Sequence, residues 1–326
     1  MVSYLFRLIV RGVPMVLLAS FLGSGHALAQ AYPSKTVRWI VPFPPGGATD
    51  ALARLMADKL SAAWKQPVVV ENKPGANTAI GTNEVAKSAP DGHVLGMVTI
   101  SHIVNPLLGA NLPYDTLKDL IGITELTRFH MALYAHPSLA ANTPAELVAL
   151  ARKDPGKFAY GSATTASYLG MELLNMMGGM KMEYIPYKGS AQALTDLLTG
   201  RISLMIDPVL ERTLQHVKLG KLKIVGTMGT QRSEITPELP VMQDAVPGYS
   251  FYGMFGLVAQ GATPPELVRR IRNDVAAVMK LPEVGERIRQ IGQEPVGSSV
   301  EEFNASIRNE MKKWEPVVKA TGAKLN

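Results

Sequence analysis

Short apolar runs rich in β-branched residues alternate with helix-length segments along most of the chain. The runs cover residues 37–41, 68–71, 94–99, 131–135, 158–162, 182–187, 202–207, 222–227 and 253–259. Most of the segments between them repeat apolar residues every three or four positions, as an amphipathic helix does. Because alternating strands and helices pack as a sheet covered by helices, the sequence predicts an α/β fold with largely parallel sheets.

Capping signals locate three helix starts. Thr143, Thr263 and Ser299 each precede a glutamate by three residues, and a proline directly follows the two threonines. A hydroxyl at the N-cap, a glutamate three residues later and a proline at the first helical position are each typical of a helix N-terminus. We therefore predict helices that begin directly after these three residues.

The middle of the chain is interpreted as a second α/β unit inserted into the first. We assign residues 30–131 and 252–326 to a discontinuous domain 1, and residues 132–251 to an inserted domain 2. Extended stretches at 125–137 and 246–259 flank the insertion, and two such crossings would form a hinge. No Gly/Ser-rich linker marks either boundary, so this hypothesis rests on the order of the elements.

The first 29 residues have the pattern of a secretory signal peptide. Arg7 and Arg11 precede an apolar run at 13–22, and a small-residue Ala-Leu-Ala pattern ends at Ala29. The apolar run is too short to cross a bilayer, so a cleaved signal is a better interpretation than a membrane anchor. We expect an exported, soluble mature chain, with cleavage after Ala29 and Ala31 as the alternative site.

Composition excludes several classes of function. The sequence has no cysteine, so thiol catalysis and thiolate metal sites are excluded, and apolar cores must provide the stability. Hydrophobic residues make up 47% of the chain and charged residues 18%, as in a folded protein. The formal charge of +6 comes from scattered Lys and Arg residues. Scattered basic residues argue against nucleic-acid binding but are compatible with a small anionic partner.

The sequence also lacks the common catalytic motifs. No G-x-S-x-G elbow occurs after the signal segment, and no H-E-x-x-H or G-x-G-x-x-G pattern is present. Ser162, Ser167 and His102 lack a spacing that predicts a nucleophile and its base. We therefore expect no catalysis, cofactor or metal. A secreted α/β hydrolase and a module that only binds other proteins remain alternatives.

The junction V-P-F-P-P-G-G-A-T-D at residues 41–50 carries the first predicted binding feature. Its prolines end the strand, and Gly46 and Gly47 let the backbone approach a ligand without an intervening Cβ. We expect Thr49 or Asp50 to cap the helix that follows. Unpaired N–H groups at such a helix start are a natural seat for a carboxylate, although a plain strand-to-helix turn is the alternative.

Five further junctions have a similar composition. They lie at residues 68–81, 98–106, 160–170, 186–191 and 205–208, where small, hydroxyl or amide residues follow an apolar run. The carboxyl ends of parallel strands meet at one edge of a sheet, and ligands of open α/β sheets bind in the crevice there. The six junctions together predict a binding cleft.

Ordered motifs along the chain resemble those of a known family. They are VPFPPGG with Asp50, ENKPGA at 71–76, APDG at 89–92, NP at 105–106, LPYD at 112–115, PYKG at 186–189, ELP at 238–240 and VPGY at 246–249. This combination resembles the Bug family, the periplasmic solute receptors of tripartite tricarboxylate transporters, from Tyr32 to the C-terminus.

The resemblance implies a fold and a mode of action. The fold would be the two-domain, type II Venus-flytrap of periplasmic binding proteins. The protein would act in the periplasm as a monomer without catalysis, capturing a small organic carboxylate and delivering it to membrane transporter subunits. A ligand-sensing receptor that feeds a signalling partner is a further alternative. Citrate, dicarboxylates, amino acids and aromatic carboxylates all remain open as ligands.

The family's ligand contacts can be carried over position by position. The resemblance places a carboxylate between the two turns of the first domain, while turns of the second domain close over the rest. The predicted contacts are Phe43, Gly46, Gly47, Thr49 and Asp50 in the first turn, Ala76, Asn77 and Thr78 in the second, Ser101 and His102 in the floor, and Ser162, Thr165, Ser167, Tyr187, Gly189 and Asp207 from the closing domain.

Three departures from the family pattern concern the ligand. Asn77-Thr78-Ala79 stands where relatives often have a glycine-rich run, and a short T-T-A-S-Y-L segment at 164–169 puts Tyr168 at a usual histidine position. Arg128 lies in a stretch that is usually small or apolar. We hypothesise that Arg128 reaches the cleft and pairs with a second carboxylate in a bidentate contact. A solvated arginine at a strand edge is the alternative.

Overall fold

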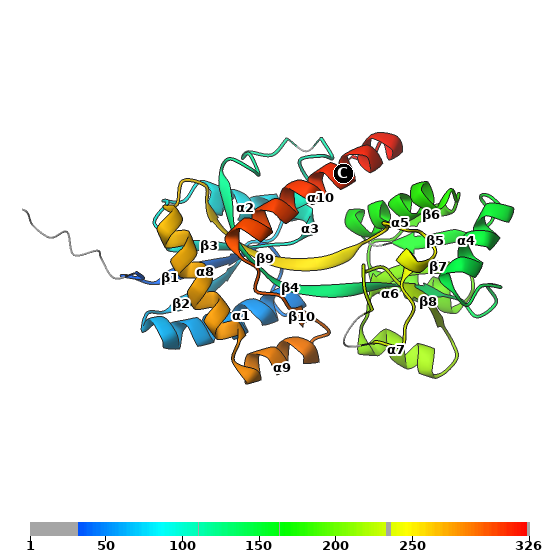
Figure 1. Cartoon of the computed structure of the whole chain (residues 1–326), viewed down its shortest axis with the longest axis horizontal. Helices are drawn as coiled ribbons and strands as arrows, with labels where there is room; N and C mark the ends of the chain where they lie inside the picture. Colours follow the sequence, from blue (N-terminus) through cyan, green and yellow to red (C-terminus); the bar gives the residue numbers. More distant parts are fainter. Residues whose placement is uncertain (1–31, 110, 163, 233–235, 325–326) are drawn as a thin grey trace, which may run out of the picture. The chain divides into compact units, whose positions relative to one another are not determined.

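Two groups of parallel strands account for most of the predicted apolar runs. The computed structural model describes residues 32–109, 111–162, 164–232 and 236–324 (Figure 1). In the first group, β1 (Val37–Val41) lies between β2 (Val68–Asn72) and β3 (Val94–Val98). In the second group, β5 (Ala159–Ser162) lies between β6 (Glu183–Pro186) and β7 (Leu204–Pro208). The α/β prediction is confirmed in both groups.

Two long antiparallel strands connect these groups. The strand order is β2-β1-β3-β9-β4-β7-β5-β6, with β9 at Tyr252–Gln260 and β4 at Leu120–Ala135. β8 (Lys223–Thr227) and the short β10 (Glu294–Pro295) also pair with β4. These added strand pairs are antiparallel, so the parallel strand pairs that the structure describes lie in the two outer groups, apart from an isolated parallel bridge between Thr227 and Val241.

The pairing partner of β4 changes within the strand. Residues 120–130 of β4 pair with β9, whereas residues 131–135 pair with β7 and β8. The change falls at 130/131, one residue before the predicted boundary at 131/132 between the two domains. By their contacts, residues 35–326 form one compact unit. The division into two domains therefore stays a prediction.

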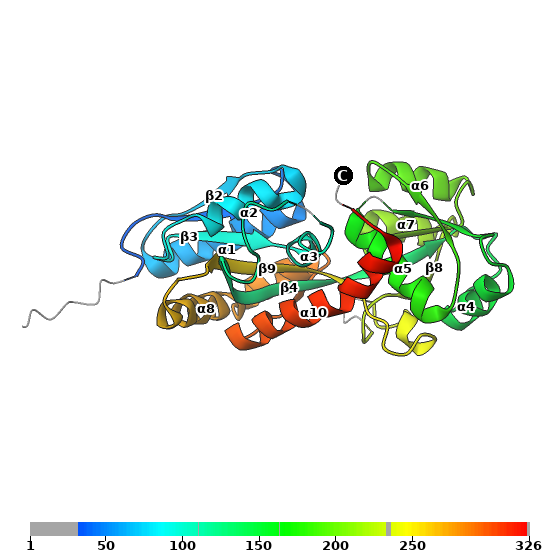
Figure 2. The same ribbon diagram turned by 90° about the horizontal axis from the view of Figure 1, so that it is seen from above.

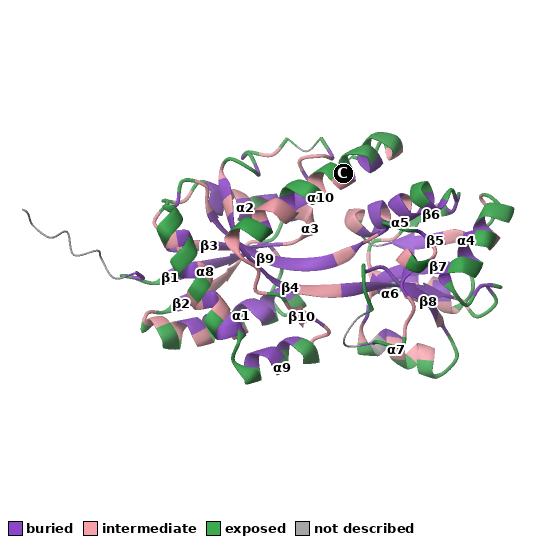
Figure 3. Cartoon of the chain, in the orientation of Figure 1, coloured by how far each residue is buried: buried purple, intermediate pink, exposed green. Residues whose placement is uncertain are grey.

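Helices flank the sheet, and the strands connecting the two groups are buried. The helices are α1 (Ala48–Trp64), α2 (Ala79–Ala86), α3 (Ile100–Val104), α4 (Pro144–Lys153), α5 (Thr165–Gly178), α6 (Ser190–Leu198), α7 (Glu211–Lys218), α8 (Pro265–Met279), α9 (Pro282–Gln290) and α10 (Val300–Thr321), with short 3₁₀ turns η1 (Ala76–Thr78) and η2 (Met242–Asp244). α10 packs on β4 and also contacts α5 (Figure 2). β9 and the end of β4 are almost wholly buried (Figure 3).

Two of the three predicted helix caps are confirmed. The Thr143 hydroxyl accepts from the Glu146 N–H at 3.2 Å, and Ser299 forms the full capping box with Glu302. The prediction for Thr263 is wrong, because α8 begins after Pro264, and this N-cap residue makes no side-chain cap hydrogen bond. The buried Thr263 hydroxyl has no hydrogen-bond partner among the described residues.

The predicted start of α1 is also wrong. Gly47, rather than Thr49 or Asp50, is the N-cap, and the helix begins at Ala48. Instead of capping the helix, the Asp50 carboxylate reaches back to accept a hydrogen bond from the Gly46 N–H at 3.0 Å. The helix thereby starts two residues earlier than its hydroxyl and acid residues suggest.

The helices of the described residues are too short or too polar to span a bilayer. The predicted signal peptide at 1–29 lies outside the described residues.

Candidate functional site

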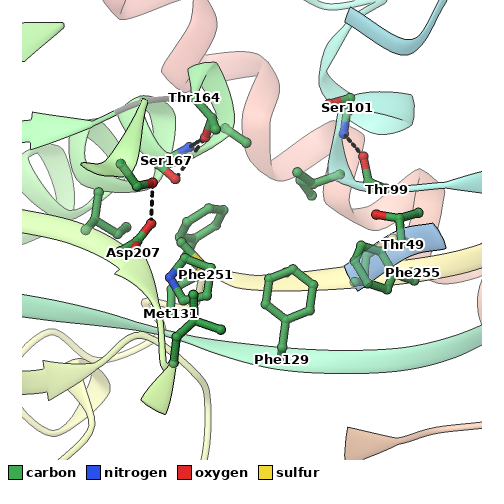
Figure 4. A pocket seen from close by; sticks show the side chains of 18 of the residues that line it. Thr49, Thr99, Ser101, Phe129, Met131, Thr164, Ser167, Asp207, Phe251 and Phe255 are labelled. Atoms are coloured by element: carbon green, nitrogen blue, oxygen red, sulfur yellow. Dashed lines mark hydrogen bonds between the residues drawn. The ribbon is translucent and has the colours of Figure 1, made fainter. Parts of the chain in front are cut away.

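A cavity of about 330 Å³ lies where several strand-to-helix junctions meet (Figure 4). Its walls come from the β1–α1, β3–α3 and β5–α5 junctions, the starts of α6 and α7, and strands β4, β7 and β9. A volume near the lower end of the range for ligand pockets suits a small molecule. Its polar lining residues are Thr49, Thr99, Ser101, Thr164, Ser167, Ser190 and Asp207.

The polar residues form two groups at opposite ends of the view in Figure 4. One group contains Thr49, Thr99 and Ser101, and the Ser101 N–H donates to the Thr99 hydroxyl at 3.3 Å. These three residues offer hydroxyls from two neighbouring junctions. A hydroxyl both donates and accepts, so this group can bind a carboxylate as a donor without a formal charge.

The second polar group is built on the α5 start and the end of β7. The Ser167 N–H donates to the Thr164 hydroxyl at 3.1 Å, and that hydroxyl donates to the Ser167 hydroxyl at 2.9 Å. Nearby, the Ser190 hydroxyl donates to Asp207 at 2.7 Å. Asp207 is buried, and it is the acidic residue among the described lining residues.

Three of the described helices begin at the cavity with an N-cap residue whose side chain makes no cap hydrogen bond. They are α1, α6 and α7, whose N-caps are Gly47, Gly189 and Leu210. Each contributes a lining residue at its N-terminus. Unpaired N–H groups and the helix dipole give such ends a partial positive charge that attracts anions. Among the described lining residues there is no Lys, Arg or His.

The central wall of the cavity is aromatic. Phe129 and Met131 come from one face of β4, and Gly253 and Phe255 come from one face of β9, with Phe251 just before it. We call Phe129, Phe251 and Phe255 the phenyl floor. The Phe129 and Phe255 ring centroids are 5.2 Å apart. In Figure 4, Phe129 stands between the two polar groups.

Asp50 organises the first junction from outside the cavity lining. One carboxylate oxygen accepts from the Gly46 N–H and the Arg54 Nε, and the other accepts from the Asn72 amide, each at 3.0 Å. The same Asn72 amide donates to the Phe43 carbonyl. The hydrogen bond from Arg54, helped by those from Gly46 and Asn72, lowers the pKa of Asp50 to about 2. The ionised carboxylate therefore fixes the 43–50 turn.

The second predicted turn has an unusual backbone. Ala76, Asn77 and Thr78 have φ values of 45°, 46° and 77°, in a region that costs non-glycine residues energy. A pair of hydrogen bonds holds it: the Asn77 amide donates to the Asn105 side chain at 2.7 Å, and the Asn105 amide donates to the Asn77 carbonyl at 2.8 Å. The described cavity lining does not include this turn.

Three further predicted contacts lie outside the described cavity lining. Ser162 and Tyr187 bond to other protein groups, whereas the buried Nδ1 of His102 has no hydrogen-bond partner among the described residues. His102 is buried, and burial lowers its pKa to about 4, so it is neutral at pH 7. The Ser162 hydroxyl donates to the Thr164 carbonyl at 2.9 Å. The Tyr187 hydroxyl donates to Asp196 at 2.9 Å, and burial together with this bond raises the pKa of Tyr187 to about 12.

Arg128 pairs within its own strand. Its Nε and Nη2 donate to the two carboxylate oxygens of buried Glu125 at 2.8 and 2.9 Å. The guanidinium carbon lies 4.1 Å from the centroid of the Tyr252 ring. Neither alternative from the sequence describes this arrangement, since the arginine is half-buried and already has a bidentate carboxylate partner.

The structure thus brings together part of the predicted set. Phe43, Thr49, Ser101, Ser167 and Asp207 line the cavity. Gly46, Gly47, Thr165 and Gly189 flank lining residues in the same turns, where Gly46 has the positive φ of 87° that favours glycine. The sequence did not predict several lining residues, some polar and some aromatic. They are the polar residues Thr99, Thr164 and Ser190 and the three phenylalanines of the phenyl floor.

The fold and the site define a class of protein. An α/β sheet flanked by helices, with a cavity at helix N-termini, is the architecture of periplasmic binding proteins, and two similar solved structures, a periplasmic transporter and the periplasmic binding protein BugD, match 91% and 90% of this chain. The sequence matches the model for the tripartite tricarboxylate transporter family receptor over residues 52–323. The chain therefore belongs to this receptor family.

Individual relatives agree with this assignment. The protein is 32% identical over 302 residues to Protein BugT of Bordetella pertussis, covering 91% of this chain and 92% of that protein. It is similar to an R. palustris protein solved with adipate, with 31% identity, a TM-score of 0.73 and coverage of 90% and 99%. It is also similar to MatC from Rhodopseudomonas palustris with bound malate, with 26% identity, a TM-score of 0.70 and coverage of 88% and 100%.

Proposed function

We propose that this receptor captures a small carboxylate-bearing solute in the periplasm and delivers it to a tripartite tricarboxylate-type membrane transporter. The observation that carries the proposal is the meeting of three uncapped helix starts and seven polar residues at one cavity. Adipate and malate, the ligands in two similar structures, are both carboxylates. We infer the delivery step and the location from membership of the family.

The proposed binding step uses neutral donors. A carboxylate would accept from the hydroxyls of Thr49, Thr99 and Ser101 and from N–H groups at the start of α1. Such donors cost less to desolvate than a buried cation, yet a hydrogen bond to a charged acceptor contributes about 1.5–3 kcal/mol. Asp50 would not touch the ligand. It would keep the Gly46 turn in the conformation that presents those donors.

The proposed closure uses the two connecting strands. If residues 132–251 move as a domain, then β4 and β9 are the segments that bend, because both connect the two strand groups. Thr164, Ser167, Ser190 and Asp207 belong to the moving segment, whereas Thr49, Thr99 and Ser101 do not. A ligand that contacts both polar groups would therefore stabilise the closed form relative to the open one.

Calorimetric titration of ligand-stripped protein tests the capture step. The protein would be unfolded, dialysed and refolded, and then titrated with malate, adipate, citrate, glutamate and benzoate. We expect saturable binding of at least one acid with a stoichiometry of one. At 100 times the dissociation constant the same acid should raise the free energy of unfolding by about 2.7 kcal/mol. Absence of binding by all carboxylates, with binding of a neutral solute instead, would contradict the proposal.

Delivery is tested separately by transport. Membrane vesicles with the transporter subunits should accumulate the labelled acid only when the loaded receptor is added. A cavity variant that no longer binds the acid provides the control. Accumulation that does not depend on the receptor would contradict delivery while leaving capture intact.

The Arg128 hypothesis remains a proposal with its own test. Contact with a second carboxylate would require the guanidinium to exchange Glu125 for the ligand. Arg128→Ala should then weaken a dicarboxylate while leaving a monocarboxylate unchanged. Equal affinities of the wild type and of folded Arg128→Ala for a dicarboxylate would end the hypothesis.

A further inference from the structure

The phenyl floor is held in place by the protein before any ligand arrives. Phe129 lies opposite Gly253 on the neighbouring strand, and a Cβ on that glycine would come within 2.0 Å of the Phe129 ring. Phe255 contacts the same ring from β9. Phe251 packs edge-on against Trp314, with ring centroids 5.7 Å apart. Because these neighbours fix the rings, the floor is a preformed surface rather than a set of flexible side chains.

Phe129 differs from the other two rings in its exposure. Phe251 and Phe255 are buried, with 2% and 6% of their surfaces exposed, whereas Phe129 is only partly buried and lines the cavity. One side of the Phe129 ring lies against Gly253 and fills the space that a side chain at that position would take. The part left open faces the cavity between the two polar groups (Figure 4). A ligand held at the hydroxyls of Thr49 and Ser101 would extend over it.

We propose that the preferred solute is an aromatic carboxylate whose ring lies on the phenyl floor. This inference rests on the proposed function and adds the body of the ligand to it. Phe129, Met131, Phe251 and Phe255 offer no hydrogen bond through their side chains, so a hydroxyl or carboxylate on the middle of the ligand would be buried without a partner there. A flat ring loses nothing on burial and makes an offset or edge-to-face contact with Phe129.

The two polar groups set the orientation of such a ring. The carboxylate would meet Thr49, Thr99 and Ser101, and the far edge of the ring would point to Thr164, Ser167 and the Ser190–Asp207 pair. A hydroxyl at the far position would find both donors and acceptors, since each of these hydroxyls can do either. Ring hydroxylation opposite the carboxylate is therefore tolerated, whereas a polar group at mid-length is not.

Matched ligands test this inference on the wild-type protein. Benzoate, 4-hydroxybenzoate and cyclohexanecarboxylate carry the same charge and a six-membered ring, but only the first two rings are flat and aromatic. We expect the better aromatic acid to bind about tenfold more tightly than cyclohexanecarboxylate. We expect malate and citrate to bind more weakly still. Tighter binding of malate, adipate or citrate than of either aromatic acid would overturn the inference and leave the proposed function standing.

A Phe129 variant tests whether the preference for aromatic acids arises at the phenyl floor. Phe129→Leu keeps an apolar side chain and removes the ring, so the aromatic advantage should fall from about tenfold to less than about threefold. Phe158→Leu, which changes a buried phenylalanine outside the cavity lining, is the matched control and should leave it unchanged. An unchanged preference in Phe129→Leu that retains its cooperative melting would also overturn the inference. Failure of every acid to bind the wild type would instead remove the proposed function.

Discussion

The β1–α1 and β5–α5 junctions occupy equivalent places in the two strand groups but are held by different chemistry. In the first, the ionised carboxylate of Asp50 gathers Gly46, Arg54 and Asn72 and is not part of the described cavity lining. In the second, the hydroxyls of Thr164 and Ser167 hold the turn and also line the cavity. The residue that holds the turn thus lies outside the described cavity lining in the first junction, whereas in the second the residues that hold the turn also line the cavity.

The largest effect is expected at Asp50. Asp50→Ala leaves the Gly46 N–H without its acceptor and removes one of the two acceptors of the Asn72 amide, so we expect the free energy of unfolding to fall by about 2–3 kcal/mol. Ligand affinity should fall as well, because the turn that presents the donors is released. Urea denaturation and calorimetric titration measure the two effects.

Asp58→Ala is the matched control for this change. Asp58 lies on the same helix but is exposed, so its replacement should change stability by no more than about 0.5 kcal/mol. Equal losses from the two variants would show that the Asp50 network does not fix the turn.

A smaller effect is expected at Thr164, where two roles meet. Thr164→Ala removes the N-cap of α5 and should lower the free energy of unfolding by about 1 kcal/mol. It should also weaken carboxylate binding, because the same hydroxyl lines the cavity. Chemical denaturation and titration with the best-bound acid report the two roles independently.

Thr143 provides an internal comparison for that prediction. It caps α4 through the same kind of bond, 3.2 Å from the Glu146 N–H, and is not among the described lining residues. Thr143→Ala should lower stability by a similar amount, about 1 kcal/mol, with unchanged affinity. If both variants bind alike, Thr164 acts only as a cap and the contrast between the junctions disappears.

The smallest effect is a pH dependence confined to the first junction. The folded-state pKa of Asp50 is lowered from 3.8 to about 2, so its contribution to stability is present above the higher value and is lost as pH falls through the lower one. Because Arg54 is half exposed, we expect a loss below about 1 kcal/mol between about pH 4 and pH 2. Asp50→Asn should remove this part of the pH dependence, as measured by denaturation across that range. An identical slope in wild type and variant would contradict it.

Local signals predicted the elements better than the contacts between them. The run at 37–41 matches β1 in both bounds, and Ser299 caps its helix as expected. Residues 125–130 of β4 lay in a predicted extended stretch, but the first five residues of β4, 120–124, were not predicted as part of the strand. The partners of this part of β4 come from far along the chain: Thr124 donates to the Ser298 carbonyl at 2.8 Å and Thr127 to Gln293 at 2.6 Å.

In the candidate site, too, contacts between segments that are far apart in the sequence could not be predicted. The junction residues Thr49, Ser101 and Ser167 could be predicted, because a polar residue after a strand has a physical meaning in an α/β fold. The phenyl floor could not, because Phe129 and Phe255 are separated by more than a hundred residues and meet only through the pairing of β4 with β9. The sequence does indicate which residues share a face of each strand. Phe129 and Met131 are two residues apart on one strand, and Gly253 and Phe255 are two residues apart on the other, so each pair points to one side of its strand.

A crystal structure of the receptor with its best-bound organic acid is the most direct test of the account. We predict a carboxylate oxygen within hydrogen-bonding distance of the Thr49 or Ser101 hydroxyl, with the body of the acid over Phe129. A carboxylate bound at another surface, or ion-paired with a cation while both hydroxyls contact only protein, would contradict it.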